Sequence, residues 1–595
     1  MKIGTDLLSS LLAEEAPERA CFMDEDLAGA SLRGLKLRKA TLRNIRLDGA
    51  DLSGADFSGC SLIDVSLRGA DLRESRWEGA RLVRVSFDGA KLLWAGFKRV
   101  RASECSFAKA CFAEADLTGS RLRGAKLTGS KLQGARIEDV DLSCAWLEEV
   151  DWRGATIVRV DLSQAILRGG VGLPKELSGL RAARADLSGL DLSGRSLGGS
   201  TLRGSRLGGA TLSRADLRGA DLSEADLTAA HLDGANLSEA DLRSSCLEGA
   251  SLEGANLERA RMDRARLRGA RLERATLVQT SFVGCDLREC RLPEGDWVGA
   301  FLGGADLSCV DLSGRDLSRA DLSRCNLAGA RLTKAILCEA DLTGADLSGA
   351  DLSGAILEGA SLDQVRLNRA RLDSSSIGFT DLRGGELRGA NLSGAVLQRA
   401  SFKGLDLREV DFRGATLRGC EFTDALLTGA NFSRCDLEGS RFTRAKMERA
   451  DLSGAWLAST NFDEAELSGA RFDVVLGDAT SFARTHISAA TFAGAVIRAP
   501  YFDGADVQGV DFSGASLDHA WFAKADLSRA RFLNAKLPSA NLSHANGEGA
   551  DFTGADLTWA NLHAMRQGKA RWDRAILDHS RPTDNDLLEA EQWIP

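Results

Sequence analysis

The stretch ADLTGADLSGADLSGAILEGA, residues 340–360, repeats nearly the same five-letter word four times: alanine, aspartate, leucine, serine or threonine, glycine. In the fourth word, Ile356 replaces the aspartate. A period of five fits neither the 3.6 residues per turn of a helix nor the two-residue alternation of a strand. It predicts a chain that turns a corner every five residues and places one large and one small apolar side chain inside each side.

The same register extends through almost the whole chain. When the leucine of each word is taken as its centre, Leu27, Leu187, Phe412 and Leu577 are all centres, separated by multiples of five. Nearly every centre is a large apolar residue, and the six exceptions are Ala102, Gly172, Ala182, Gly477, Gly547 and Gln567. The residue two places before each centre is small, usually alanine. Four such sides close a square coil of twenty residues, so we expect coils that stack on one another.

Words of the form A(D/N)LSG resemble those of the pentapeptide-repeat proteins, which form a right-handed quadrilateral parallel β-helix. The resemblance covers residues 25–580 and implies an all-β solenoid of about 28 coils, stacked at the strand spacing of roughly 4.8 Å. Phenylalanine occupies the centre at ten-residue intervals from Phe402 to Phe532, with Leu452 as the one lapse. Ten residues are half a coil, so we expect two stacked ladders of phenylalanine on opposite sides.

Both ends of such a solenoid expose apolar interior and strand edges, so they need caps. Residues 1–24 are predicted to form an N-terminal cap whose short helix covers 5–16. Residues 581–595 are predicted to form the C-terminal cap, with a helix at 584–594 and Trp593 as its plug.

Between the caps, the sequence predicts an N-terminal repeat block at 25–170 and a C-terminal repeat block at 185–580. The irregular stretch 171–184 separates them and contains Pro174. The five-residue phase survives across it, which favours a kink or bulge within one solenoid. Two stacked β-helix blocks are the alternative.

Charge and hydropathy exclude several classes of protein. The net charge is −9, and residues 1–170 contribute almost none of it. No basic block indicates nucleic-acid binding, and no apolar run approaches the length of about 20 residues that spans a bilayer. The first residues have acidic flanks and no cleavage site typical of a signal peptide. We therefore predict a cytoplasmic protein that binds neither membrane nor nucleic acid directly, and the resemblance implies a bacterial source.

The cysteines and histidines predict no reactive centre. Seven of the thirteen cysteines occupy the small inward position, where cysteine packs as a small hydrophobe: Cys60, Cys105, Cys285, Cys290, Cys325, Cys420 and Cys435. All six histidines lie at positions predicted to face outward, and His544 and His563 fall on the same side of adjacent coils. No nucleophile, base and orienting acid come together. We predict no catalytic residue, no metal and no cofactor, hence no enzyme.

Two arginines break the inward pattern. Arg195 and Arg315 occupy the small inward position in near-copies of one another, DLSGLDLSGRSL and DLSCVDLSGRDL. An unpaired guanidinium is not stable in an apolar core, so we expect these corners to open outward. Their role, including anion binding, is left open.

The position before the centre is normally Asp, Asn, Ser or Arg, and its apolar exceptions line up. Read every twenty residues from 336 to 496, six of nine members of one outward column are apolar: Ile336, Ile356, Val396, Trp456, Leu476 and Val496. Tyr501 and Trp521 stack on adjacent coils of the next side. An extended exposed apolar surface usually marks an interaction site. These eight residues are the predicted protein-binding residues, and side chains that fold back over the coil wall are the alternative.

The favoured function is therefore a non-enzymatic scaffold or adaptor that docks a protein partner, or a second copy of itself, along this apolar stripe. The family resemblance implies a second candidate, because some pentapeptide-repeat proteins mimic DNA and bind type II topoisomerases such as gyrase. DNA carries one charge per about 1.7 Å of axis, so the dilute acidity of this chain fits that role poorly. A bacterial secretion-system accessory or effector is a further alternative, which no motif supports directly.

Overall fold

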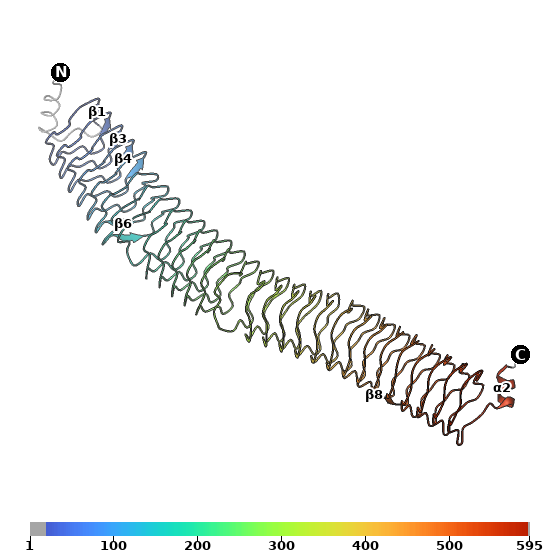
Figure 1. Cartoon of the computed structure of the whole chain (residues 1–595). Coiled ribbons are helices and arrows are strands. Elements are labelled where there is room, and N and C mark those ends of the chain that lie inside the picture. Colours follow the sequence, from blue (N-terminus) through green and yellow to red (C-terminus); the bar gives the residue numbers. More distant parts are fainter. Residues whose placement is uncertain (1–19, 593–595) are drawn as a thin grey trace. The chain divides into compact units, whose positions relative to one another are not determined.

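The computed structural model describes residues 20–592, and the chain winds in successive coils (Figure 1). Parallel bridges join Asp26 to Arg46, Ser31 to Asp51 and Lys36 to Asp56. Each partner lies twenty residues further along the chain, so four sides of five residues complete one coil. The predicted all-β, right-handed quadrilateral parallel β-helix is confirmed. The N-terminal helix predicted at 5–16 lies outside the described residues.

Most sides of a coil contribute a single bridge, and only a few are long enough to form three-residue strands. One parallel sheet contains β1 (Cys21–Met23), β2 (Thr41–Arg43), β3 (Ser61–Ile63), β4 (Arg81–Val83) and β5 (Arg101–Ser103). Two parallel pairs follow, β6 (Arg136–Glu138) with β7 (Thr156–Val158), and β8 (Leu476–Asp478) with β9 (Val496–Arg498). The sides are short because a corner follows each of them.

Each corner is a tight turn with one residue in the left-handed region. In the word that begins at Asp51, the N–H of Ala55 donates to the carbonyl of Leu52 at 3.0 Å. Gly54, the third residue of this turn, has φ = 68°, and a positive φ at this position is what a type II turn requires. Glycine adopts that conformation without steric cost. The frequent recurrence of glycine at this position of the repeat is therefore a property of the corners.

The aspartate of each word ties the corner to the side. The Oδ1 atom of Asp51 accepts the N–H of Ser53 at 3.2 Å and the hydroxyl of Ser53 at 2.7 Å. The same pair of bonds joins Asp551 to Thr553, at 3.0 and 2.5 Å. An aspartate that accepts the amide two residues on is a recognised turn stabiliser. The repeated aspartates therefore stabilise the corners, and they recur with the same period as the corners.

The interior holds the centres and the small residues between them. Leu52 and Ala55 have no solvent exposure. The phenylalanines stack as the two predicted ladders: Phe402, Phe422 and Phe442 are separated by 4.8 and 4.6 Å between ring centroids, with interplanar angles of 2°. Rings of one ladder meet those of the other edge to face, as between Phe422 and Phe432 at 89°. Offset and edge-to-face contacts add to the stabilisation from burial.

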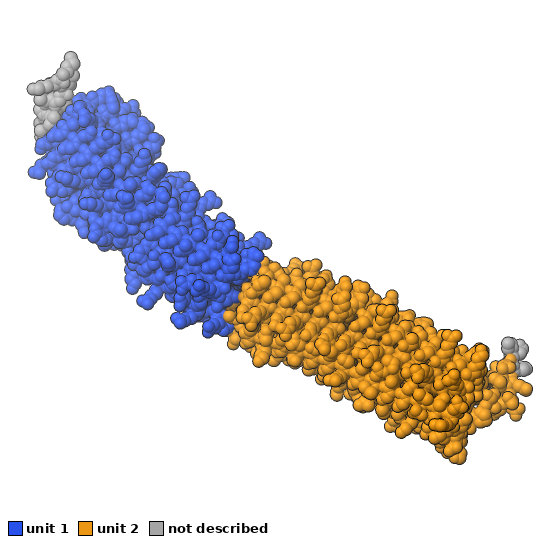
Figure 2. Space-filling view, in the orientation of Figure 1, with its two compact units in different colours: residues 1–295 blue, residues 296–595 orange. Residues whose placement is uncertain are grey.

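The chain divides into two compact units, Met1–Gly295 and Asp296–Pro595, which Figure 2 colours separately. In unit 1 the bridges continue to Arg271–Arg291, and in unit 2 they begin with Phe301–Asp321. This division at 295 and 296 was not predicted, because Leu292 and Trp297 keep the five-residue phase. Within unit 1, two bridges span the irregular stretch 171–184, Asp161–Arg181 and Ile166–Asp186. For that stretch, a kink or bulge within one solenoid and a boundary between two stacked β-helix blocks both stay predictions.

A single helix follows the last coil in the described part of the chain (Figure 1). It is α2, Asn585–Gln592, and it confirms the C-terminal helix predicted over 584–594 as far as residue 592; Trp593 lies outside the described residues. Asp584 is its N-cap, because its Oδ1 accepts the N–H groups of Asp586 and Leu587, both at 3.1 Å. Among the described residues, no helix is both long and apolar enough to cross a membrane.

We expect acid to destabilise the solenoid, because several corner aspartates, among them Asp51 and Asp151, have lowered pKa values. The hydrogen bond from the Ser53 hydroxyl is the largest cause that lowers the pKa of Asp51 to about 2. The hydrogen bond from the Arg153 guanidinium is the largest cause that lowers the pKa of Asp151, also to about 2. A carboxyl group with a lower pKa in the folded state contributes stability that is present above its unfolded pKa of about 3.9 and is lost as the pH falls through the folded value.

The melting temperature, followed by circular dichroism, should therefore be flat near neutral pH and fall progressively from about pH 4 to about pH 2. The double variant Asp51→Asn/Asp151→Asn keeps the oxygen that accepts the corner amides but cannot titrate. It should lose part of the pH dependence. A melting temperature that does not change over this range would contradict the account.

Candidate functional site

The predicted apolar stripe lies along one column of bridges in unit 2, and the structure brings half of it together. Trp456, Leu476 and Val496 are bridged in succession on three consecutive coils. They are 41%, 48% and 50% exposed, so none has folded back into the interior. Leu476 and Val496 begin strands β8 and β9. Three large apolar side chains at strand spacing form a continuous surface.

The other three members of the stripe lie apart from this group. Ile336 and Ile356 are bridged to each other but are half-buried. Val396 is exposed, and its bridge partners are Ser376 and Thr416. These three residues lie in the same column as predicted, but the polar residues Ser376, Thr416 and Asp436 separate them from Trp456.

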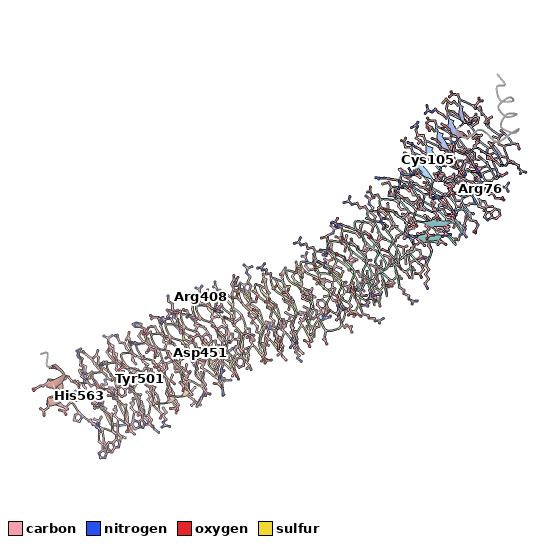
Figure 3. The ribbon with its side chains drawn as sticks, turned by 180° about the vertical axis from the view of Figure 1, so that it is seen from behind. Arg76, Cys105, Arg408, Asp451, Tyr501 and His563 are labelled. Carbon is pink, nitrogen blue, oxygen red and sulfur yellow. The ribbon has the colours of Figure 1, made fainter. Side chains whose placement is uncertain are left out.

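Tyr501 and Trp521 form the second predicted group, on the next side of the coil. Their rings stack at 6.0 Å between centroids with an interplanar angle of 27°. They are 40% and 42% exposed, and Tyr501 is labelled in Figure 3. The indole N–H of Trp521 donates to Asp503 at 3.3 Å. Stacking and this hydrogen bond hold the pair in place while leaving ring surface in contact with solvent.

One large apolar residue beside this group was missed by the sequence analysis. Val474 occupies a corner with φ = 51° and is 59% exposed. The corners nearby hold small residues in place of the arginine or glutamate common elsewhere: Ala458, Ala479, Ala483, Ala493 and Ala499. A search of corner positions, and not only of the position before the centre, would have found both signals. We call Trp456, Val474, Leu476, Val496, Tyr501 and Trp521 the 456–521 patch.

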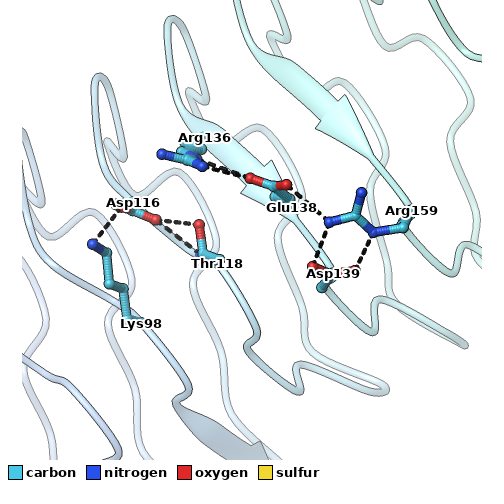
Figure 4. A network of polar contacts seen from close by, with 7 residues as sticks. All are labelled: Lys98, Asp116, Thr118, Arg136, Glu138, Asp139 and Arg159. Carbon is cyan, nitrogen blue, oxygen red and sulfur yellow. Dashed lines mark hydrogen bonds and ion pairs between the residues drawn. The ribbon is translucent and has the colours of Figure 1, made fainter.

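Charged side chains elsewhere on the solenoid mostly neutralise one another. In one column of unit 2, Arg331, Arg371 and Arg471 each approach the aspartate one coil earlier, at 3.5, 3.4 and 3.6 Å. Unit 1 shows a similar network in Figure 4, where Glu138 accepts from Arg136 and Arg159. Many carboxylates are therefore engaged in ion pairs.

The inward cysteines have no nucleophilic character. Six of the seven are buried and Cys290 is half-buried. Burial raises the pKa of Cys60, Cys285 and Cys325 to about 12. The thiolate is the reactive form of cysteine, so these thiols act as packing groups, as predicted.

The two inward arginines are half-buried. The Nη1 of Arg195 donates to the carbonyl of Ser193 at 3.2 Å. The guanidinium of Arg315 lies over the ring of Trp297, 5.9 Å from its centroid. Both arginine side chains are therefore only partly exposed, so the two corners open outward only in part.

Histidine 563 contradicts the prediction that all six histidines face outward. Its side chain is only 7% exposed, because α2 and the segment before it cover that corner. The backbone N–H of Asp584 donates to its Nδ1 at 3.1 Å. Its Nε2 lies 3.3 Å from Glu591, and the Nε2 of His544 lies 3.1 Å from the same carboxylate oxygen. His563 is labelled beside this helix in Figure 3.

Within residues 20–592, His544, His563 and Glu591 are the one group of three side chains close enough to hold a metal ion. A metal at Nε2 of His563 would need that nitrogen without its proton, and the proton would then have to be on Nδ1. Nδ1 instead accepts a backbone N–H. The neutral ring with its proton on Nε2 satisfies both neighbours, since Nε2–H then donates to Glu591. The arrangement fits a hydrogen-bonded clamp on α2 and not a metal site.

Replacing His563 with alanine should release α2. The helix has eight residues and buries none of them, and a helix shorter than about 12 residues is marginal in water without tertiary contacts. Hydrogen exchange measured by mass spectrometry should show protection of residues 585–592 in the wild type and its loss in the variant.

The matched control is His579→Ala, because His579 is exposed and stacks on Trp559 at 4.2 Å. This variant should keep the protection of α2. Added zinc should leave the exchange of α2 unchanged; slower exchange with zinc would mean that the histidine pair binds the ion and that the clamp description is wrong.

Comparison with protein families gives a match along most of the chain. The model that matches describes pentapeptide repeats, and the matched segments are 26–62, 66–101, 105–143, 183–219, 220–259, 255–292, 285–324, 320–359, 351–389, 378–414, 406–444, 420–457, 445–473, 490–529 and 525–563. No curated protein matched the sequence.

Several solved structures are similar to this chain. HetL, a pentapeptide repeat protein involved in heterocyst differentiation regulation in the cyanobacterium Nostoc, is 27% identical over 47% of this chain and 97% of its own, with a TM-score of 0.19. QnrB1, a plasmid-mediated fluoroquinolone resistance protein, is 25% identical over 33% of this chain and 91% of its own, with a TM-score of 0.18. A pentapeptide repeat protein of the Arabidopsis thaliana thylakoid lumen is 38% identical over 15% of this chain and 66% of its own, with a TM-score of 0.11.

Proposed function

We propose that this chain, which belongs to the pentapeptide-repeat family, is a non-enzymatic scaffold that docks a protein partner on the 456–521 patch. The observation that carries the proposal is the run of Trp456, Leu476 and Val496 on consecutive coils, each about half exposed. The repeat itself calls for a polar residue at this position, and Asp, Asn, Ser or Arg fills it in most coils. Three successive departures toward large apolar residues have a cost in solubility that a binding role accounts for.

The composition of the patch supports a protein partner. Tryptophan and tyrosine are the residues most often found at the energetic centres of protein interfaces, and the patch contains Trp456, Tyr501 and Trp521. Tyr501 and Trp521 are already stacked, so little side-chain entropy remains to be lost on binding.

The surroundings of the patch support the same conclusion. The alanines at the nearby corners are too short to cover the apolar side chains. Beside them, Asp478 of β8 is paired in register with Arg498 of β9, which places one charge of each sign at the margin. Apolar centres with a charged rim are the usual anatomy of an interface.

The pairing of charged side chains gives less support to the alternative function, DNA mimicry. Mimicry needs a long row of unpaired carboxylates, whereas the aspartates at 311, 351 and 451 each face an arginine one coil later, at 3.5, 3.4 and 3.6 Å. The corner amides occupy an oxygen of Asp311, Asp351 and Asp451 as well. We therefore favour the apolar patch as the binding surface over an acidic face.

The double variant Trp456→Asp/Trp521→Ser should abolish partner binding. Loss of an interface centre costs at least about 2 kcal/mol, or roughly thirtyfold in affinity. The measurement has two parts: affinity capture from native lysate with quantitative mass spectrometry, and sedimentation velocity for self-association. In the variant, the partner or dimer present with the wild-type protein should be lost.

The matched control is Trp94→Ser, since Trp94 is 57% exposed at a corner of unit 1, outside the patch. It should keep every interaction, and melting curves should show that both variants are folded. If the double variant retains all partners, the patch is only a covering of the coil wall and the proposal is wrong.

A further inference from the structure

Three arginines are stacked on consecutive coils of unit 1. Arg81 is bridged to Arg101, and Arg101 to Arg121. All three side chains are exposed. Between residues 21 and 581, this is the one place where three successive members of a bridge column carry charge of the same sign. We call these three residues the arginine strip.

Arginines in bridge columns normally find a carboxylate at one of three positions. The first is one coil earlier, as Arg181 pairs with Asp161 at 2.7 Å. The second is eighteen residues earlier, as Arg271 pairs with Glu253 at 2.9 Å. The third is two residues away in the same coil, as Arg136 pairs with Glu138 at 2.6 Å. These positions are close because of the coil geometry. A carboxylate one coil later can also serve, as Arg366 pairs with Glu386 at 3.5 Å.

The arginine strip has no carboxylate at any of the first three of these positions. One coil earlier lie Ser61, Arg81 and Arg101; eighteen residues earlier lie Ile63, Val83 and Ser103; two residues away lie Gly79, Val83, Arg99, Ser103, Gly119 and Arg123. Among the described residues, none contributes an ion pair or a side-chain hydrogen bond to the strip. Among residues 20–592, the three guanidinium groups are therefore without a partner, on side chains whose backbone positions are about 4.8 Å apart along the column.

The acidic residues around the strip do not compensate for it. Glu78 is paired with Arg99, and Asp116 is held by Lys98 and Thr118, as Figure 4 shows. Asp141, one coil after Arg121, accepts the N–H and the hydroxyl of Ser143.

Glu104 is exposed near Arg84, whose own partner is Asp64. Arg123 and Lys126 add two exposed cations beside the strip. The region is therefore positive in a chain of net negative charge.

Like charges stacked directly across adjacent strands are destabilising. Elsewhere in residues 20–592, stacks of like charge stop at two members, as in Asp51–Asp71, Arg271–Arg291 and Asp321–Asp341. A stack of three unpaired guanidiniums works against folding, and binding of an anion would remove that repulsion.

From this placement we infer that the arginine strip is a second docking surface, which binds an acidic α-helical segment of a protein partner. On one face of a helix, side chains three and four residues apart are separated by about 5–6 Å. That spacing is close to the distance of about 4.8 Å between the backbone positions of the three arginines on successive coils. Each Arg–carboxylate contact can be bidentate. The aliphatic side chains of Ile63 and Val83 flank the column and would contact the stems of the bound glutamates.

A nucleic acid fits the surface less well. Proteins that bind single strands combine a basic groove with aromatic side chains on which bases stack. The positions beside the arginine strip hold isoleucine, valine, serine, glycine and arginine. The inference concerns unit 1 and does not depend on the 456–521 patch, which lies in unit 2.

The test uses the full chain and a fluorescein-labelled, helix-forming peptide with glutamate at every fourth position of an alanine-rich sequence. Fluorescence anisotropy should show binding that weakens at least about tenfold between about 50 and about 300 mM salt, as expected for exposed charges. The triple variant Arg81→Gln/Arg101→Gln/Arg121→Gln should reduce the affinity by at least about tenfold. A peptide with glutamine in place of glutamate should not bind.

The matched control removes three arginines that already have partners, Arg331→Gln/Arg371→Gln/Arg471→Gln. It changes the net charge by the same amount and should keep peptide affinity within about twofold. The two variants should also differ in melting temperature: relief of repulsion should keep or raise it in the strip variant, whereas lost ion pairs should lower it in the control.

Three results would overturn the inference. The first is equal loss of peptide binding in both triple variants, which would indicate a net-charge effect. The second is a fluorescein-labelled oligothymidylate that binds more tightly than the peptide and loses its affinity in the strip variant. The third is no peptide binding by the wild-type chain at the lowest salt concentration.

Discussion

The whole structure depends on one backbone requirement: a residue in the left-handed region at nearly every fifth position. This residue turns the chain through a corner, and four corners return it to a point directly above its start. All parallel bridges between residues twenty apart follow from that return. So do the stacked interior side chains and the columns of outward ones. Where glycine is absent from the corner, other residues adopt the same conformation, as Arg84 does at φ = 50° and Val474 at 51°. Stacking against the neighbouring coils therefore outweighs the steric cost of a side chain there.

Most of the fold could be predicted from the sequence, because the same five-residue pattern of local structure recurs more than a hundred times. The coil period and the two phenylalanine ladders both follow from spacing alone. The division at residues 295 and 296 did not follow from it, since Leu292 and Trp297 keep the phase. A register argument detects a change in the number of residues per side, but not a change in how well successive sides pair.

The candidate site was predicted only in part, and for a similar reason. Reading one column found Trp456, Leu476 and Val496, but exposure decided that Ile336 and Ile356 differ from them. Val474 and the surrounding alanines lie at corners, which a reading of the columns omits. The burial of His563 depended on where α2 packs, and no repeat encodes that contact. The repeat pattern does not predict contacts between segments that follow different patterns, such as the last coils and α2.

Because the side chains of a column are twenty residues apart, the surface is far more sensitive to insertions and deletions than the core is. A change of five residues, one whole word, leaves every interior position filled and every corner in place. It nevertheless turns all later residues by one side. Loss of one word between Trp456 and Leu476 would move Leu476 and Val496 onto the neighbouring face and separate them from the tryptophan, while apolar side chains would still fill every interior position. Only changes of a whole coil preserve both. A solenoid of this kind can therefore gain or lose residues in units of five and still fold. Only changes in units of twenty keep the columns of surface residues aligned.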